Sequence, residues 1–93
     1  MKARLIHNLK LIGEHGAIEE RKIWEVPVSE INPDGIRYRL AYILPGQDKP
    51  AVLYDNHHPK GHHKHIKGQQ SAYPFSGVEQ LIRDFRRDIE GLK

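Results

Sequence analysis

The stretch Ile36-Arg37-Tyr38-Arg39-Leu40-Ala41-Tyr42-Ile43-Leu44 carries the clearest alternation of side chains in the sequence. Successive side chains of an extended strand point to opposite faces of its sheet. One face of this stretch is apolar and consists of Ile36, Tyr38, Leu40, Tyr42 and Leu44. The other face carries Arg37 and Arg39, which either line a groove that binds anions or are simply solvated. The pattern predicts a half-buried strand at the centre of the fold.

The residues before this strand predict two more strands and the turns that join them. Asn32-Pro33-Asp34-Gly35 is a strong turn signal, because proline fixes its own φ and glycine tolerates positive φ. Residues 17–26 alternate as a strand that Pro27 ends. Residues 5–12 fit either a strand or a helical stripe. We favour a strand, because Glu14-His15-Gly16 then forms a hairpin turn.

The residues after the central strand predict a turn, a fourth strand and a loop. Residues 45–50 contain two prolines and a glycine and turn the chain, and residues 51–56 form a short strand. Residues 68–75 predict a loop, in which Tyr73 either stacks on a base or covers the core.

The C-terminal residues predict a helix. Ser76 followed by Glu79 has the spacing of a capping box, and Gly91 ends the pattern. Apolar residues recur at helical spacing between them: Val78, Leu81, Ile82, Phe85, Ile89 and Leu92. The whole chain, 1–93, therefore predicts a single α+β domain, a four-stranded, mostly antiparallel meander with a C-terminal helix packed on one face.

Composition limits the functions open to this domain. The 93 residues include no cysteine, which excludes a disulfide framework, thiolate chemistry and zinc sites built on sulfur. No apolar run is long enough for a transmembrane helix or a signal peptide, so we expect a cytoplasmic protein without a membrane partner. The formal charge of +3 fits an anionic partner without requiring one.

The segment Tyr54–His65 gathers most of the groups that titrate near neutral pH. It holds five of the seven histidines, together with Asp55, Asn56, Lys60 and Lys64. Imidazoles act as general acid or base and lysines stabilise a phosphate, so metal-free phosphodiester cleavage is one reading. Imidazoles are also metal ligands, and a histidine-rich loop can also be a solvated turn.

Spacing within the segment singles out two histidines. His63 and His65 are two residues apart, so in extended backbone they project to the same side, and His62 points the other way. The pair can act on one phosphate, with Asp55 orienting an imidazole. In the metal alternative, His63 and His65 need a third ligand, Asp55 or His57.

Several segments together resemble the TumE family of bacterial and archaeal toxin components, formerly a family of unknown function. The resemblance spans nearly the whole chain and rests on Trp24-Glu25-Val26-Pro27, Tyr38-Arg39-Leu40-Ala41-Tyr42, Tyr54-Asp55-Asn56, Lys60-Gly61-His62-His63-Lys64-His65, Tyr73-Pro74-Phe75 and the helix at 79–85. Its most specific part is an aspartate and asparagine at a strand end followed by Gly-x-His-x-His, here Asp55, Asn56, Gly61, His63 and His65.

The resemblance implies a toxin held inactive by an antitoxin with a helix-turn-helix domain. We add the hypothesis of a metal-independent ribonuclease, in which His63 and His65 are general base and acid. Lys60 or Lys64 stabilises the phosphorane, and Asp55 orients an imidazole. RNA is the substrate because the attack needs its 2′-hydroxyl. No cofactor is required.

Further residues complete the predicted site. Those expected to bind are Arg37, Arg39, Asn56, Gly61 and Tyr73. The competing hypotheses are a non-enzymatic module that binds the antitoxin or nucleic acid through the basic loop, and a metal-dependent hydrolase that uses His57, His63 and His65. A homodimer through an uncovered sheet edge is a further expectation.

Overall fold

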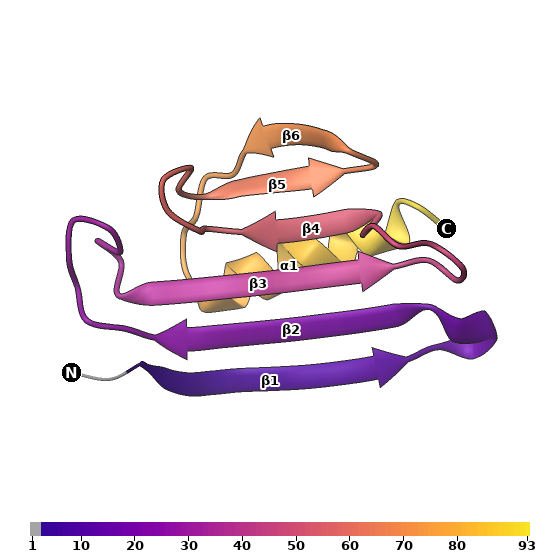
Figure 1. The fold of residues 1–93 in the computed structure, drawn as a ribbon, viewed down its shortest axis with the longest axis horizontal. Helices are drawn as coiled ribbons and strands as arrows, with labels where there is room; N and C mark the ends of the chain where they lie inside the picture. The colour runs from indigo at the N-terminus through magenta and orange to yellow at the C-terminus, as the bar shows by residue number, and fades with distance from the viewer. Residues whose placement is uncertain (1–2) are drawn as a thin grey trace.

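The computed structural model describes residues 3–93, so Met1 and Lys2 of the predicted domain lie outside it. Six antiparallel strands pair in chain order, and one helix covers one face of the sheet (Figure 1). The strands are β1 (Arg4–Ile12), β2 (Ile18–Glu25), β3 (Ile36–Ile43), β4 (Val52–Asp55), β5 (His63–Ile66) and β6 (Gln69–Ala72), and the helix is α1 (Val78–Glu90).

The predicted α+β class, the antiparallel meander and the C-terminal helix are confirmed, and the favoured strand at 5–12 is confirmed as β1. The predicted number of four strands is wrong, because β5 and β6 extend the sheet beyond β4. They are joined by Lys67 and Gly68, whose φ angles are 50° and 82°. Positive φ at both central residues is the geometry of a type I′ hairpin, which matches the twist of paired strands.

The helix begins at Val78 after Gly77, and no side chain caps its first turn. The predicted capping box of Ser76 and Glu79 is therefore wrong. Gly77 occupies the N-cap with φ 124° and ψ 163°, a conformation that strongly favours glycine, and this places Ser76 one residue too early. Gly91 follows the last helical residue, as predicted. No helix within residues 3–93 has the length and apolar character needed to cross a membrane.

The hydrophobic core lies between the sheet and α1, which passes behind β3 and β4 in Figure 1. The helix contributes Leu81, Phe85 and Ile89, as its apolar spacing predicts. The sheet contributes Ile23, Tyr38, Leu40, Val52 and Tyr54. We call the side of the sheet that packs on α1 the covered face and the opposite side the open face.

Candidate active site on the open face of the sheet

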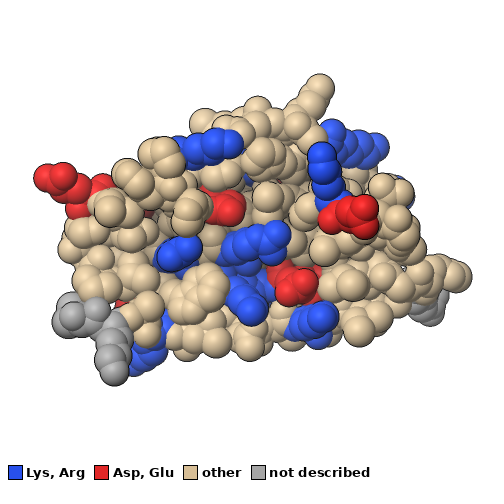
Figure 2. All heavy atoms as spheres, viewed as in Figure 1, with Lys and Arg blue, Asp and Glu red and all other residues tan. Residues whose placement is uncertain are grey.

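The register of the strands places the predicted site on the open face. Arg39 pairs with Asp55, and Asp55 pairs with His63. Directly paired residues point to the same face, and their chain neighbours Leu40 and Tyr54 are buried on the covered face. Arg39, Asp55 and His63 therefore share the open face. Figure 2 views this side of the molecule and shows Lys and Arg atoms gathered near its middle, with acidic atoms beside them.

The His63 and His65 rings lie next to each other on β5. Their centroids are 5.2 Å apart and their planes meet at 76°. His65 pairs with Leu53 of β4 and Gln70 of β6, so it lies one cross-strand row away from His63. Two imidazoles at this separation can both reach one phosphodiester.

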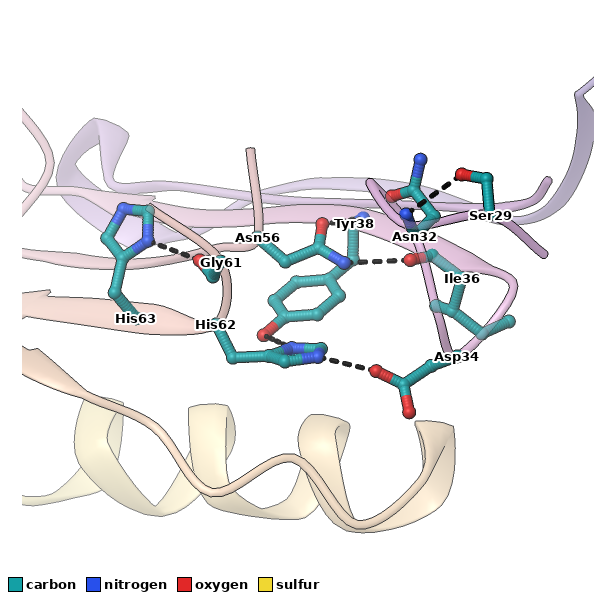
Figure 3. Close-up of polar contacts among 9 residues, drawn as sticks. All are labelled: Ser29, Asn32, Asp34, Ile36, Tyr38, Asn56, Gly61, His62 and His63. Carbon is teal, nitrogen blue, oxygen red and sulfur yellow. Dashed lines mark hydrogen bonds and ion pairs between the residues drawn. The ribbon is translucent and has the colours of Figure 1, made fainter. Parts of the chain in front are cut away.

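The orientation of His63 is fixed by a backbone contact. Its Nδ1 lies 2.8 Å from the carbonyl oxygen of Gly61, which can only accept, so Nδ1 carries the proton (Figure 3). The side chain is 6% exposed. Its Nε2 forms no hydrogen bond within residues 3–93 and is not among the fully enclosed polar atoms without a partner, so a small part of it reaches the surface. That nitrogen is the one available for proton transfer.

His65 is half-buried, and its environment disfavours the charged imidazolium. Burial, then the neighbouring His63 and Lys60, lower the pKa of His65 below its usual value of 6.5, while Asp55 opposes the shift. At neutral pH His65 is therefore a neutral imidazole that can accept a proton.

Asp55 closes the turn that follows β4. Its Oδ1 accepts the backbone N–H of His57 at 2.6 Å. Within residues 3–93 no hydrogen bond joins Asp55 to an imidazole. The carboxylate nevertheless lies directly opposite His63 in the strand register, where it can balance a positive charge.

The two predicted lysines lie on opposite sides of the sheet. Lys60 Nζ donates to Gln70 Oε1 at 3.1 Å, and Gln70 pairs with His65, so Lys60 reaches over the open face. Lys64 pairs with Tyr54 and donates to Asp88 of α1 at 3.1 Å, which places it on the covered face. Only Lys60 is therefore brought to the histidine pair.

Both predicted arginines are exposed on the open face. Arg37 Nη2 lies 3.1 Å from His57 Nδ1, which accepts because a guanidinium can only donate. This contact directs His57 to Arg37, and among the described residues no three His, Asp or Glu side chains converge in a way that could hold a metal ion. The alternative metal set of His57, His63 and His65 is not assembled.

Three residues of the predicted binding set have structural partners. The Asn56 amide accepts from the backbone N–H of Tyr38 at 2.9 Å and donates to the Ile36 carbonyl at 2.7 Å, so it ties the end of β4 to β3 (Figure 3). Gly61 has φ 70° and supplies the carbonyl that orients His63. Tyr73 is 6% exposed and donates to buried Asp84 at 2.6 Å, so it covers the core, the second of its two predicted roles.

A group of polar and aromatic contacts around His62 was not predicted. His62 Nε2 donates to Asp34 at 2.7 Å, and the Tyr38 hydroxyl donates to His62 Nδ1 at 2.9 Å. The imidazole also stacks on Phe75, with ring centroids 4.7 Å apart and an angle of 4°. Figure 3 shows His62 and His63 directed to opposite sides of β5. Both nitrogens of His62 are occupied, which suits an anchor for the loop before β5 better than an acid or base.

The one sequence signal for this cluster is that His62 follows Gly61 and points opposite to His63. Its partner Asp34 lies 28 residues away in the predicted turn 32–35, and no local pattern connects the two. These contacts could therefore not be predicted from the sequence alone.

Comparison with protein families gives one finding. The family described as toxin TumE matches residues 2–93. The chain belongs to the TumE toxin family. No curated protein and no solved structure matches the chain. The match extends over all six strands and α1, so the TumE domain and the fold described above coincide. A TumE toxin implies an antitoxin as its partner.

Proposed function

We propose that this TumE toxin is a metal-independent endoribonuclease whose acid and base are His63 and His65. The observation that supports it best is the placement of the two rings, 5.2 Å apart on an uncovered face. His63 is oriented by the Gly61 carbonyl, and Lys60 lies alongside His65. Such a pair supplies the proton transfers that cleavage of an RNA phosphodiester requires.

The lowered pKa of His65 favours this histidine as the base. Neutral His65 removes the proton from a ribose 2′-hydroxyl, and the 2′-oxygen forms a bond to the adjacent phosphorus. His63 acts as the acid and donates a proton from Nε2 to the 5′-oxygen as the phosphorus–oxygen bond breaks. The products are a 2′,3′-cyclic phosphate and a 5′-hydroxyl. No metal or other reactant is needed.

Charged neighbours support the two histidines. The Gly61 carbonyl accepts a hydrogen bond from Nδ1–H of His63 before and after proton transfer at Nε2. The Asp55 carboxylate lies opposite His63 and balances the positive charge of the imidazolium. Lys60 stands on the open face beside His65, where it stabilises the additional negative charge of the phosphorane. Lys64 has no part in this mechanism, because it is held by Asp88 on the covered face.

The second candidate is a binding module that arrests growth by occupancy. The exposed cations of the open face favour it, because they attract an anionic partner with or without catalysis. In that case Lys60→Gln weakens function more than His63→Ala does, and binding weakens steeply with salt.

The proposal extends to partner and location. The antitoxin is a helix-turn-helix protein, and the toxin meets RNA in the cytoplasm. A homodimer would form at an edge of the sheet, and β1 exposes Leu5, Ile6, Leu11 and Ile12 along one of these edges.

The direct test incubates the purified toxin with a mixed RNA pool, with and without EDTA. We expect cleavage that chelator does not reduce and products that end in a 2′,3′-cyclic phosphate, detected because their 3′ ends cannot be labelled until the cyclic phosphate is opened and the resulting phosphate is removed. Loss of cleavage with EDTA would show that the reaction requires a metal ion. No cleavage in either condition would favour the binding module.

The dependence of cleavage on pH gives a second check. The base must be neutral, so kcat/KM rises with pH through the pKa of His65. Because that pKa is lowered, we expect the acidic limb of the profile below pH 6.5. Lys60→Gln removes one cause of the lowering, so its limb should move to higher pH whatever its effect on the maximal rate. An acidic limb above 6.5 would contradict His65 as the base.

A further inference from the structure

The open face carries side chains in rows that cross the strands. One row contains Lys22 on β2, Arg39 on β3, Asp55 on β4 and His63 on β5, each paired with the next. We call it the Lys22 row. Neighbouring strands are about 4.8 Å apart, so Lys22 and His63 are separated by roughly 14 Å along it. The row leads from the β2 side of the sheet directly to the histidine pair.

The cations of this face are available to a ligand. Lys22, Arg37 and Arg39 are exposed, and none forms an ion pair within residues 3–93. Arg37 donates to His57, whereas Lys22 and Arg39 form no side-chain hydrogen bond among these residues. Exposed cations without a partner are the groups that contact phosphates, each displacing counterions from the nucleic acid. Figure 2 shows this gathering of Lys and Arg atoms near the middle of the face. A polyanion that follows the Lys22 row meets Lys22 and Arg39 first, and then passes Asp55 to reach His63.

An aromatic side chain stands beside the cations. Trp24 pairs with Arg37, and its chain neighbour Ile23 is fully buried on the covered face, so Trp24 is on the open face. It is half-buried, and it lies next to the Lys22 row. Tryptophan on a cationic surface stacks on unpaired bases, whose flat faces need no particular sequence.

We propose that the open face binds single-stranded RNA, with one base stacked on Trp24 and phosphates held by Lys22 and Arg39. The inference rests on the proposed ribonuclease function and specifies its substrate class. The strand crosses the sheet along the Lys22 row and presents a phosphodiester to His63 and His65, a few nucleotides from the stacked base. Duplex RNA does not fit this arrangement, because its bases are already stacked on one another.

Binding is measured apart from cleavage, with protein that carries His63→Ala and His65→Ala. A fluorescently labelled single-stranded RNA of mixed sequence is titrated by anisotropy at several salt concentrations, and the same sequence is tested as a duplex. We expect tighter binding of the single strand. Trp24→Leu should weaken it about 5- to 100-fold. Arg39→Gln should weaken it and reduce the dependence of log affinity on log salt by about one.

Arg86→Gln is the matched control, because Arg86 is an exposed arginine on α1, remote from the open face, and should leave affinity unchanged. Equal affinity for duplex and single strand, or parent-like affinity of the Arg39→Gln variant, would overturn the inference even if Trp24→Leu fails to fold. Binding of an acidic antitoxin peptide in place of RNA would overturn it as well.

The cleavage assay separates the two proposals. Normal cleavage rates in the Trp24→Leu and Arg39→Gln variants, each with His63 and His65 intact, would leave the ribonuclease standing and exclude this binding path. The opposite result is single-strand binding that depends on Trp24 and Arg39, without cleavage by the unmodified toxin. It would support the RNA-binding face and contradict the ribonuclease function.

Discussion

Replacing both His63 and His65 with alanine is expected to lower RNA cleavage by at least about 10²- to 10⁴-fold, because the reaction loses its acid and its base together. Growth arrest on expression should disappear with it. The measurement is the initial rate on a defined RNA, beside the growth of cells that express each variant. Persistent toxicity in the double variant would remove these histidines from the mechanism.

The control for this experiment is His15→Asn. His15 lies in the turn between β1 and β2, at the end of the sheet away from the start of β5 in Figure 1, and has φ 67°. Asparagine tolerates that conformation better than alanine does. The control should cleave RNA like the parent. Far-ultraviolet circular dichroism of the double variant checks that its sheet is retained, because His63 is almost fully buried.

Phe85→Ala is expected to remove a large part of the stability of the domain. Phe85 is fully buried and packs edge-on against Tyr54 at 5.7 Å between ring centroids. Deleting a buried phenylalanine ring costs about 3–5 kcal/mol. A domain of 93 residues is stable by about 5–14 kcal/mol, at about 0.05–0.15 kcal/mol per residue. The variant should unfold at much lower urea concentration, or be unfolded without denaturant.

Arg86→Ala on the same helix provides the comparison. Its side chain is exposed, so the change should alter the free energy of unfolding by less than about 0.5 kcal/mol. Equal urea midpoints for Phe85→Ala and the parent would show that α1 does not hold the sheet.

The sequence predicts those elements whose side chains follow a regular period. β3 alternates from Ile36 to Leu40, and the spacing of Leu81, Phe85 and Ile89 is that of a helix on a sheet, so both were predicted. β5 and β6 read His63-Lys64-His65-Ile66 and Gln69-Gln70-Ser71-Ala72, with few apolar residues to mark a buried face. Their strand structure depends on pairing with β4 and on the turn at Lys67 and Gly68. That two-residue turn was the signal available in the sequence.

The site was predictable as far as local spacing reaches. A period of two places His63 and His65 on one side, and their rings are neighbours in the structure. The same period places Lys64 on the side of β5 opposite to His63 and His65. Its ion pair with Asp88 of α1 could not be predicted, because it depends on where the helix packs. The contact between His62 and Asp34 joins residues that only the folded sheet brings together. The catalytic roles themselves remain predictions.

The order of the elements along the chain controls when the toxin becomes functional during synthesis. Helix α1 leaves the ribosome after all six strands, yet it supplies Leu81, Phe85 and Ile89 to the core. A nascent chain that ends before residue 78 has every residue of the histidine pair but no layer to cover Tyr54 and Leu40. Interrupted translation therefore yields fragments that lack the helical side of the hydrophobic core, and we expect such fragments not to fold.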